Sequence, residues 1–157
     1  MEKALNNLAE QLGSLLLARG LSLSLAESCT GGLGAEIITR VAGSSAWFDC
    51  AVVSYSNASK VNLLKVASDT LDKFGAVSEQ TAVEMASGVM AISGSQLSAA
   101  VTGIAGPAGG TQAKPVGTVC FAGVAVTDDG AFKPGRAAGH ARDDFRAQAA
   151  GARFSQA

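Results

Sequence analysis

Ser28, Tyr55 and Lys60 are the residues of this chain whose types and spacing best suit covalent chemistry. Ser28 lies in the segment ESCTGG, and Tyr55 and Lys60 begin and end the segment YSNASK. A serine hydroxyl is a poor nucleophile unless a base takes its proton. A lysine can be that base where desolvation or a neighbouring positive charge lowers its pKa, and Tyr55 could relay a proton or hold the amine by a hydrogen bond. The three residues are therefore candidates for nucleophilic catalysis, with Ser28 as the nucleophile and Lys60 as its base.

Each candidate also fits an ordinary structural position. A serine before a helix is commonly an N-cap, and Ser28 does not lie in a GxSxG motif. Lys60 fits a surface position in the first turn of a helix, because lysine is rarely buried. Glu27 could be a catalytic carboxylate or could favour the dipole of a following helix. His140, the single histidine, fits a solvated surface position better than a second base.

Two glycine-rich turns could bind an anion such as a phosphate through their backbone amides. Thr30, Gly31 and Gly32 precede a predicted helix, and Gly103–Gly110 follows a predicted strand. Both segments also fit tight turns, for which glycine is the usual residue. Neither matches GxGxxG or GxxxxGK[ST], so a dinucleotide fold or a P-loop is not indicated.

The elements that must position these turns follow from hydrophobic periodicity. Helices are expected over residues 3–19, 33–41, 57–65 with Asn57 as cap, 70–74, 78–92 with Ser78 as cap, and 142–154. Strands are expected over residues 22–26, 48–55, 97–102, 116–126 as a central strand, and within 131–139 after a hairpin turn at 128–130. Alternation of helices and strands predicts one three-layer α/β/α domain with a mixed sheet. Open sheets of this class place ligands at strand ends, where the polar segments 27–32, 54–60 and 102–110 fall.

Composition narrows the class of protein. The 157 residues are 48% hydrophobic and 16% charged, which argues against a disordered chain. A net charge of -1 without a basic run disfavours a nucleic-acid partner. The first twenty residues lack the pattern of a signal peptide, and no stretch approaches the ~18 apolar residues of a membrane span. We therefore expect a soluble, cytoplasmic protein without a membrane partner, and the apolar, glycine- and alanine-rich composition favours a homo-oligomer.

The remaining sulfur and aromatic side chains are expected to be structural. Cys29, Cys50 and Cys120 are an odd number without CxxC spacing, and one histidine cannot readily complete a zinc site with them. We expect reduced, small core residues, no metal and no cofactor. Trp47 fits the core or an interface, and the methionines at 85 and 90 fit the core.

Six segments in order give the chain a family resemblance. They are AESCTGG at 26–32, GSSAWF at 43–48, YSNASK at 55–60, GAVSE at 75–79, TGIAGPAGG at 102–110 and KPVGTV at 114–119. Over about residues 5–150 the chain resembles the C-terminal domain of the competence/damage-inducible protein CinA, which in many bacteria stands alone as nicotinamide-nucleotide amidohydrolase. The resemblance implies a single domain over 1–157, without the N-terminal molybdopterin-binding-like domain of longer members.

The resemblance also implies an activity. It is hydrolysis of the carboxamide of nicotinamide mononucleotide (NMN) to nicotinic acid mononucleotide and ammonia, a step of pyridine-nucleotide recycling that needs no metal. By resemblance Ser28 is the nucleophile, Lys60 its base and Tyr55 an assisting residue, and backbone amides over 29–32 stabilise the oxyanion. A nucleotide-binding or regulatory module without catalysis is the main alternative. A serine amidase or esterase with another small phosphorylated substrate is the third.

The remaining substrate contacts are also carried over from the family. Thr102, Gly103 and Gly106 correspond to pocket residues, and Arg142 corresponds to an arginine suited to phosphate. Family members often have Gly-Asp-Arg at this point, whereas this chain has Ala141 in place of the aspartate. A role of that aspartate in positioning the arginine is therefore not expected here.

Overall fold

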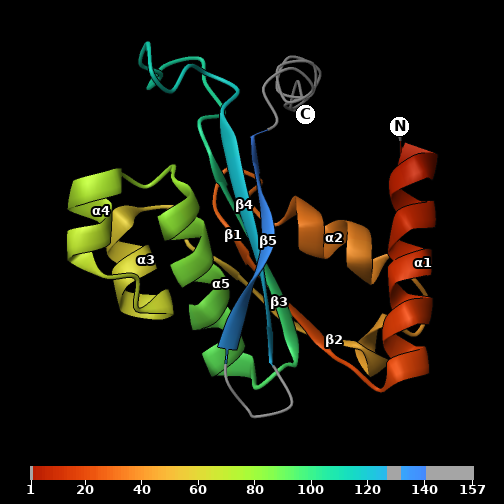
Figure 1. Cartoon of the computed structure of the whole chain (residues 1–157). Coiled ribbons are helices and arrows are strands. Elements are labelled where there is room, and N and C mark those ends of the chain that lie inside the picture. The colour runs from red at the N-terminus through yellow and green to blue at the C-terminus, as the bar shows by residue number, and fades with distance from the viewer. Residues whose placement is uncertain (1, 127–131, 141–157) are drawn as a thin grey trace.

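A five-stranded mixed sheet forms the centre of the computed structural model, which describes residues 2–126 and the backbone of residues 132–140 (Figure 1). The strands are β1 (Leu23–Glu27), β2 (Phe48–Val53), β3 (Leu97–Gly103), β4 (Val119–Val126) and β5 (Phe132–His140), in the spatial order β2-β1-β3-β4-β5. β1 runs parallel to both β2 and β3, whereas β3 pairs antiparallel with β4, and β4 with β5.

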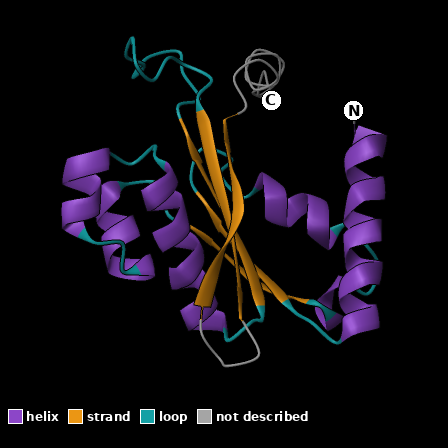
Figure 2. Cartoon of the chain, in the orientation of Figure 1, coloured by secondary structure: helices purple, strands orange, loops and turns teal. Residues whose placement is uncertain are grey.

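Helices cover both faces of the sheet, which confirms the predicted three-layer α/β/α architecture (Figure 2). They are α1 (Glu2–Arg19), α2 (Leu33–Thr39), α3 (Asn57–Leu64), α4 (Ser68–Phe74) and α5 (Glu79–Ser93), with a 3-10 turn, η1, at Ser44–Ala46. α1 and α2 lie on one side of the sheet, and α3, α4 and α5 lie on the other. Within the part of the chain described, no helix is long and apolar enough to cross a membrane.

Two apolar clusters hold these layers together. On one face, Met85 and Met90 of α5 are buried against the sheet, as their helical spacing predicts. On the other face, Trp47 is 1% exposed and packs with Leu16 of α1 and Ile38 of α2. Trp47 is therefore a core residue, one of the two positions that the sequence allows.

Several predicted boundaries differ from the structure. The strand expected over 116–126 begins at Val119, because the amide of Gly117 donates to the carbonyl of Ile104 in the preceding loop. This strand is interior but not central, since the middle of the sheet is β3. The strand expected over 48–55 ends at Val53. The strand expected over 22–26 is displaced by one residue to Leu23–Glu27, and the strand expected over 97–102 extends by one residue to Gly103.

The caps of α3 and α5 differ in how well the sequence predicts them. Asn57 is not the cap of α3: Ser56 is, through a capping box with Ser59. Ser78 caps α5 as expected, its hydroxyl accepting from the amide of Thr81 at 3.2 Å. The hairpin turn predicted at 128–130 and the last helix predicted over 142–154 lie outside the described residues.

Candidate active site

The ends of three parallel strands meet at one edge of the sheet and bring the polar segments together. Glu27, the last residue of β1, is in register with Val53 of β2 and Val101 of β3. The amide of Ser28 donates to the carbonyl of Val101 at 3.0 Å, and the amide of Ser54 donates to that of Glu27 at 2.8 Å. Ser28 is thereby fixed between the two neighbouring strands, where open α/β sheets place their ligands.

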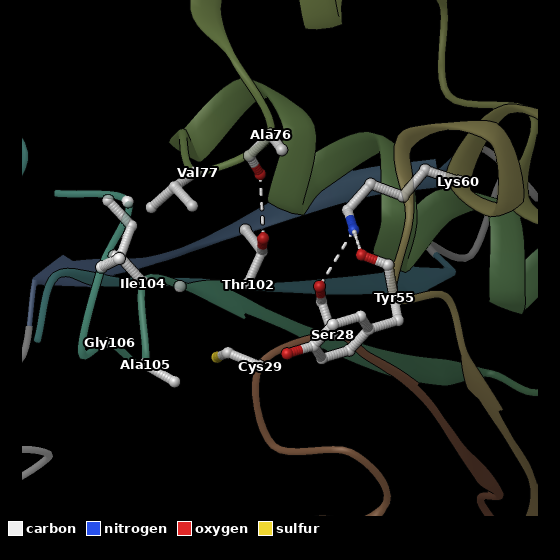
Figure 3. A pocket seen from close by; sticks show the side chains of 13 residues that line it. Ser28, Cys29, Tyr55, Lys60, Ala76, Val77, Thr102, Ile104, Ala105 and Gly106 are labelled. Carbon is white, nitrogen blue, oxygen red and sulfur yellow. Dashed lines mark hydrogen bonds between the residues drawn. The ribbon is translucent and has the colours of Figure 1, made fainter. Parts of the chain in front are cut away.

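Lys60 reaches Ser28 from the first turns of α3, and its side chain lies inside the protein (Figure 3). Residue 60 is only 1% exposed, so the surface position considered from the sequence is wrong. Nζ donates to Oγ of Ser28 at 2.9 Å, to the carbonyl of Ser54 at 2.7 Å and to the carbonyl of Tyr55 at 3.4 Å. Ser28 is not a helix cap, because the N-cap of α2 is Gly32.

The surroundings of Lys60 suit a neutral amine. Burial away from water disfavours the charged form and lowers the pKa of Lys60 below its ordinary value of 10.5. A neutral amine has two N–H bonds and one lone pair, and carbonyl oxygens only accept hydrogen bonds. The charged amine donates one N–H to each of the three oxygens. In the neutral amine the carbonyls of Ser54 and Tyr55 can take the two remaining N–H bonds, and the lone pair can then accept the hydroxyl proton of Ser28. The arrangement can therefore deprotonate Ser28 without a histidine.

Tyr55 contacts the amine through its backbone. The amine donates to the backbone carbonyl of Tyr55, which a residue of any type would offer, so the role predicted for the tyrosine side chain stays a prediction; Tyr55 is 72% exposed and lines the pocket. Ser54, whose carbonyl makes the shorter contact, is absent from the sequence-based candidates. A backbone carbonyl leaves no signal in residue type, so only the path of the chain after β2 reveals it.

The turn after Ser28 differs from the expected substrate-binding turn. Cys29 lines the pocket beside Ser28, but Thr30, Gly31 and Gly32 do not. The Thr30 hydroxyl and the Gly32 amide donate to the carboxylate of Glu27, and the Gly31 amide donates to the carbonyl of Ser28. These groups are engaged within the protein, so the structure does not place them where a substrate anion would need them.

Cys29 lies beside Ser28 but is a poor rival nucleophile. Burial raises the pKa of its thiol to about 11, so the sulfur is protonated at neutral pH. Cys29, Cys50 and Cys120 are all free, and Cys120 is the buried one of the three.

The opposite wall of the pocket contains the three residues carried over from the family. Thr102 is 1% exposed, and its hydroxyl donates to the carbonyl of Ala76 at 2.8 Å. A Cβ on Gly103 would lie 2.9 Å from the Sγ of Cys29, so only glycine leaves room for the turn that contains Ser28 and Cys29. Gly106 has a φ of +83°, which favours glycine. Ala76 belongs to the segment GAVSE, which resembles the family but had suggested no site residue.

These residues enclose a cavity of about 280 Å³. It is lined by Ser28, Cys29, Tyr55, Lys60, Ala76, Val77, Thr102, Gly103, Ile104, Ala105, Gly106, Ala108 and Gly109. Among the described residues that line it, Lys60 is the one basic side chain, and its amine is directed at Ser28. Arg142, the expected phosphate contact, lies outside the described residues. The cavity is slightly smaller than the usual range for small-molecule sites, roughly 300–1,000 Å³.

Comparisons with known proteins agree on one family. The family model described as the CinA C-terminal domain matches residues 5–156. The chain is 54% identical over 120 residues to nicotinamide-nucleotide amidohydrolase PncC of Enterobacter agglomerans, covering 76% of this chain and 73% of that protein. It is 46% identical over 129 residues to PncC of Escherichia coli K12, covering 82% and 78%.

Longer proteins and solved structures share the same region. A CinA-like protein of Chloroherpeton thalassium is 53% identical over 120 residues, which are 76% of this chain but 28% of that protein. The crystal structure of the competence/damage inducible protein CihA from Agrobacterium tumefaciens matches with a TM-score of 0.81 and 42% identity, covering 92% of this chain and 86% of that one.

Proposed function

The chain belongs to the CinA C-terminal domain family, and from that premise we propose that it hydrolyses the carboxamide of NMN to nicotinic acid mononucleotide and ammonia. The observation that carries the proposal is the buried amine of Lys60, 2.9 Å from the Oγ of Ser28. Relatives at 54% and 46% identity bear the name nicotinamide-nucleotide amidohydrolase. A module that only bound nucleotides would have no use for a desolvated lysine beside a serine hydroxyl.

The first half of the reaction forms an ester on Ser28. Neutral Lys60 takes the hydroxyl proton as Oγ attacks the carboxamide carbon. The backbone amide of Cys29, which lines the pocket and donates to no other described residue, is the candidate to stabilise the oxyanion. The C–N bond then breaks, Lys60 returns the proton to the departing nitrogen, and ammonia leaves.

The second half releases the acid. Water attacks the ester carbon while Lys60 takes one of its protons, and the C–Oγ bond breaks. The proton passes from Lys60 to Oγ, which restores Ser28 and the neutral amine. One amide and one water give one carboxylic acid and one ammonia, so the cycle is balanced. Tyr55 assists in this scheme by holding the amine through its carbonyl.

The rest of the substrate binds to the walls described above. Thr102, Gly103 and Gly106 form the pocket opposite Ser28, and Arg142 contacts the 5′-phosphate. Replacing Arg142 by alanine should therefore raise KM for NMN more than it lowers kcat.

A cytoplasmic homo-oligomer acting in pyridine-nucleotide recycling is part of the proposal, and light scattering of the purified protein tests its oligomeric state.

The substrate is tested by incubating the purified, metal-stripped protein with NMN and measuring ammonia and nicotinic acid mononucleotide together. Equal amounts of the two products are expected. Binding of NMN by calorimetry without release of ammonia would favour the regulatory nucleotide-binding module instead. Turnover of another phosphorylated amide or ester, but not of NMN, would keep the Ser28–Lys60 chemistry and replace the substrate.

A further inference from the structure

Glu27, the residue before the candidate nucleophile, carries a buried carboxylate that the proposed reaction does not use. It is 1% exposed at the end of β1. One oxygen, Oε2, accepts from the Thr30 hydroxyl at 2.6 Å and from the amides of Gly32 and Gly34 at 3.1 Å each. The other, Oε1, accepts from the amide of Ala35 at 2.8 Å. Four donors thus converge on one carboxylate from the turn and the helix that follow Ser28.

This carboxylate takes the place of a cap at the start of α2. The N-cap residue, Gly32, has a φ of +105° and no side chain to accept a hydrogen bond from the first amides. Glu27 accepts from these amides instead, across the turn. A Cβ on Gly34 would lie 3.1 Å from Oε1 of Glu27, so the glycine lets the helix approach the carboxylate closely.

The same contacts decide which amides of the turn remain available. Those of Gly32, Gly34 and Ala35 donate to Glu27. The amides of Cys29 and Thr30, which follow Ser28 directly, donate to no other described residue. Direct participation of Glu27 in the reaction is disfavoured, because both of its oxygens are occupied and it does not line the pocket.

We propose that Glu27 is a positioning residue: its carboxylate folds the turn so that Ser28 faces Lys60 and the amide of Cys29, which lines the pocket beside it, stays available for the oxyanion. The inference rests on the proposed use of Ser28 as a nucleophile. The sequence allows Glu27 to be a catalytic carboxylate or to stabilise the start of the following helix. The proposal assigns it the second role and adds that the same contacts orient Ser28.

The direct test is Glu27→Gln, which keeps the size of the side chain. Backbone amides, which only donate, face both carboxylate oxygens, so the amide nitrogen of glutamine must face at least one backbone N–H group and repel it. We expect kcat for NMN to fall about 100-fold, the effect typical of a lost oxyanion contact, with KM nearly unchanged. Glu36→Gln is the matched control, because Glu36 lies on α2, the helix that Glu27 caps, with its side chain exposed and paired to Arg40. It should stay within about twofold of wild type.

A second readout does not depend on NMN. The rate at which a fluorophosphonate labels Ser28, followed by mass spectrometry, should fall in Glu27→Gln and not in Glu36→Gln. Unchanged kcat and unchanged labelling in a folded Glu27→Gln protein would overturn the inference. If the wild type labels at Ser28 but does not release ammonia from NMN, the proposed substrate fails, and labelling alone decides the role of Glu27. If the wild type neither labels nor turns over, both proposals fall together.

If circular dichroism shows that Glu27→Gln does not fold, Thr30→Val is the replacement variant for the same test. It removes one of the four donors and leaves the carboxylate in place. We expect about a tenfold loss of kcat, in keeping with one hydrogen bond to a charged group, and slower labelling of Ser28. Wild-type kcat and labelling in Thr30→Val would overturn the inference in that case. Combining Thr30→Val with Glu27→Gln should lower kcat by less than the product of the single effects, because both act on one network.

Discussion

At the residue scale, the proposed chemistry depends on the position of the Lys60 amine. Lys60 has an ordinary place in the first turns of α3, yet its amine lies against Ser28 and the carbonyls of Ser54 and Tyr55. The main chain after β2 supplies acceptors, and the interior supplies desolvation. Together they provide what the proposed mechanism needs to use as its base a residue that is charged at neutral pH in water.

The proposed base makes the reaction depend on pH. Because burial lowers the pKa of Lys60, the fraction of neutral amine rises with pH and reaches one half below 10.5, the ordinary value. We expect kcat/KM for NMN to rise from neutral pH with a midpoint below that value. A steady-state pH profile checks this. A rate that falls as pH rises over the same range would contradict the role of Lys60, whereas Lys60→Arg, which stays charged, should be inactive throughout.

The same group links stability to pH. In the unfolded chain Lys60 titrates near 10.5, and in the folded protein its pKa is lower. Between these two values the unfolded state binds more protons, so the free energy of unfolding rises with pH in that window. Urea unfolding should therefore show wild type gaining stability relative to Lys60→Met as pH rises from neutral toward 10.5. A difference between the two proteins that does not change with pH would contradict a lowered pKa.

At the scale of elements, the site depends on how closely β3 approaches the turn after β1. Gly103 ends β3, and the loop after it is tied to the end of α4 by Lys114, whose amine donates to the carbonyl of Phe74. The end of β3, the turn that contains Ser28 and the loop after Gly103 thus surround the pocket. Small residues are required where these three converge.

Replacing Gly103 by alanine should disturb both stability and activity. The added Cβ would lie 2.8 Å from the carbonyl of Thr118 and 2.9 Å from the Sγ of Cys29. We expect the free energy of unfolding to fall by about 1–3 kcal/mol and kcat/KM to fall as Ser28 is displaced. Gly123→Ala in β4 is the matched control, because its Cβ would meet only the carbonyl of Ser98 at 3.8 Å. Equal effects of the two changes would show that Gly103 has no special role.

At the scale of the whole molecule, the layer of α1 and α2 supports the fold at a distance from the pocket. Gly13 of α1 lies so close to Trp47 that a Cβ would be 2.7 Å from the indole ring. The helix is therefore docked on the sheet through one buried aromatic side chain, and none of these residues lines the cavity.

Gly13→Ala should separate stability from catalysis. In a free helix this change would stabilise by about 1 kcal/mol, but the contact with Trp47 should reverse the sign and cost about 1–3 kcal/mol. Ser14→Ala on the same helix, at an exposed position, is the control and should be neutral or slightly stabilising. Thermal unfolding measures both, and kcat for NMN should be unchanged in the folded fraction. A stabilised Gly13→Ala protein would contradict this packing.

The sequence predicts much of this arrangement because periodicity and strand ends are local signals. The helices of residues 3–19 and 78–92, the three layers and the strand-end position of Ser28 all follow from such patterns. The burial of Lys60 does not, because it depends on Ser56 capping α3 and on the chain direction after β2. The contacts of Glu27 were also beyond prediction, since a carboxylate before a helix does not reveal which amides it will take. Arg142 remains a prediction from the family resemblance.

The measurement that most directly tests the central claim is ammonia release from NMN by wild type and by Ser28→Ala, with NMN binding to both proteins measured by calorimetry. In the proposed mechanism Oγ of Ser28 forms the bond to the substrate, so its removal should lower kcat by at least about three orders of magnitude while NMN still binds. Ammonia release by Ser28→Ala at a rate near that of wild type would contradict the assignment of Ser28 as the nucleophile.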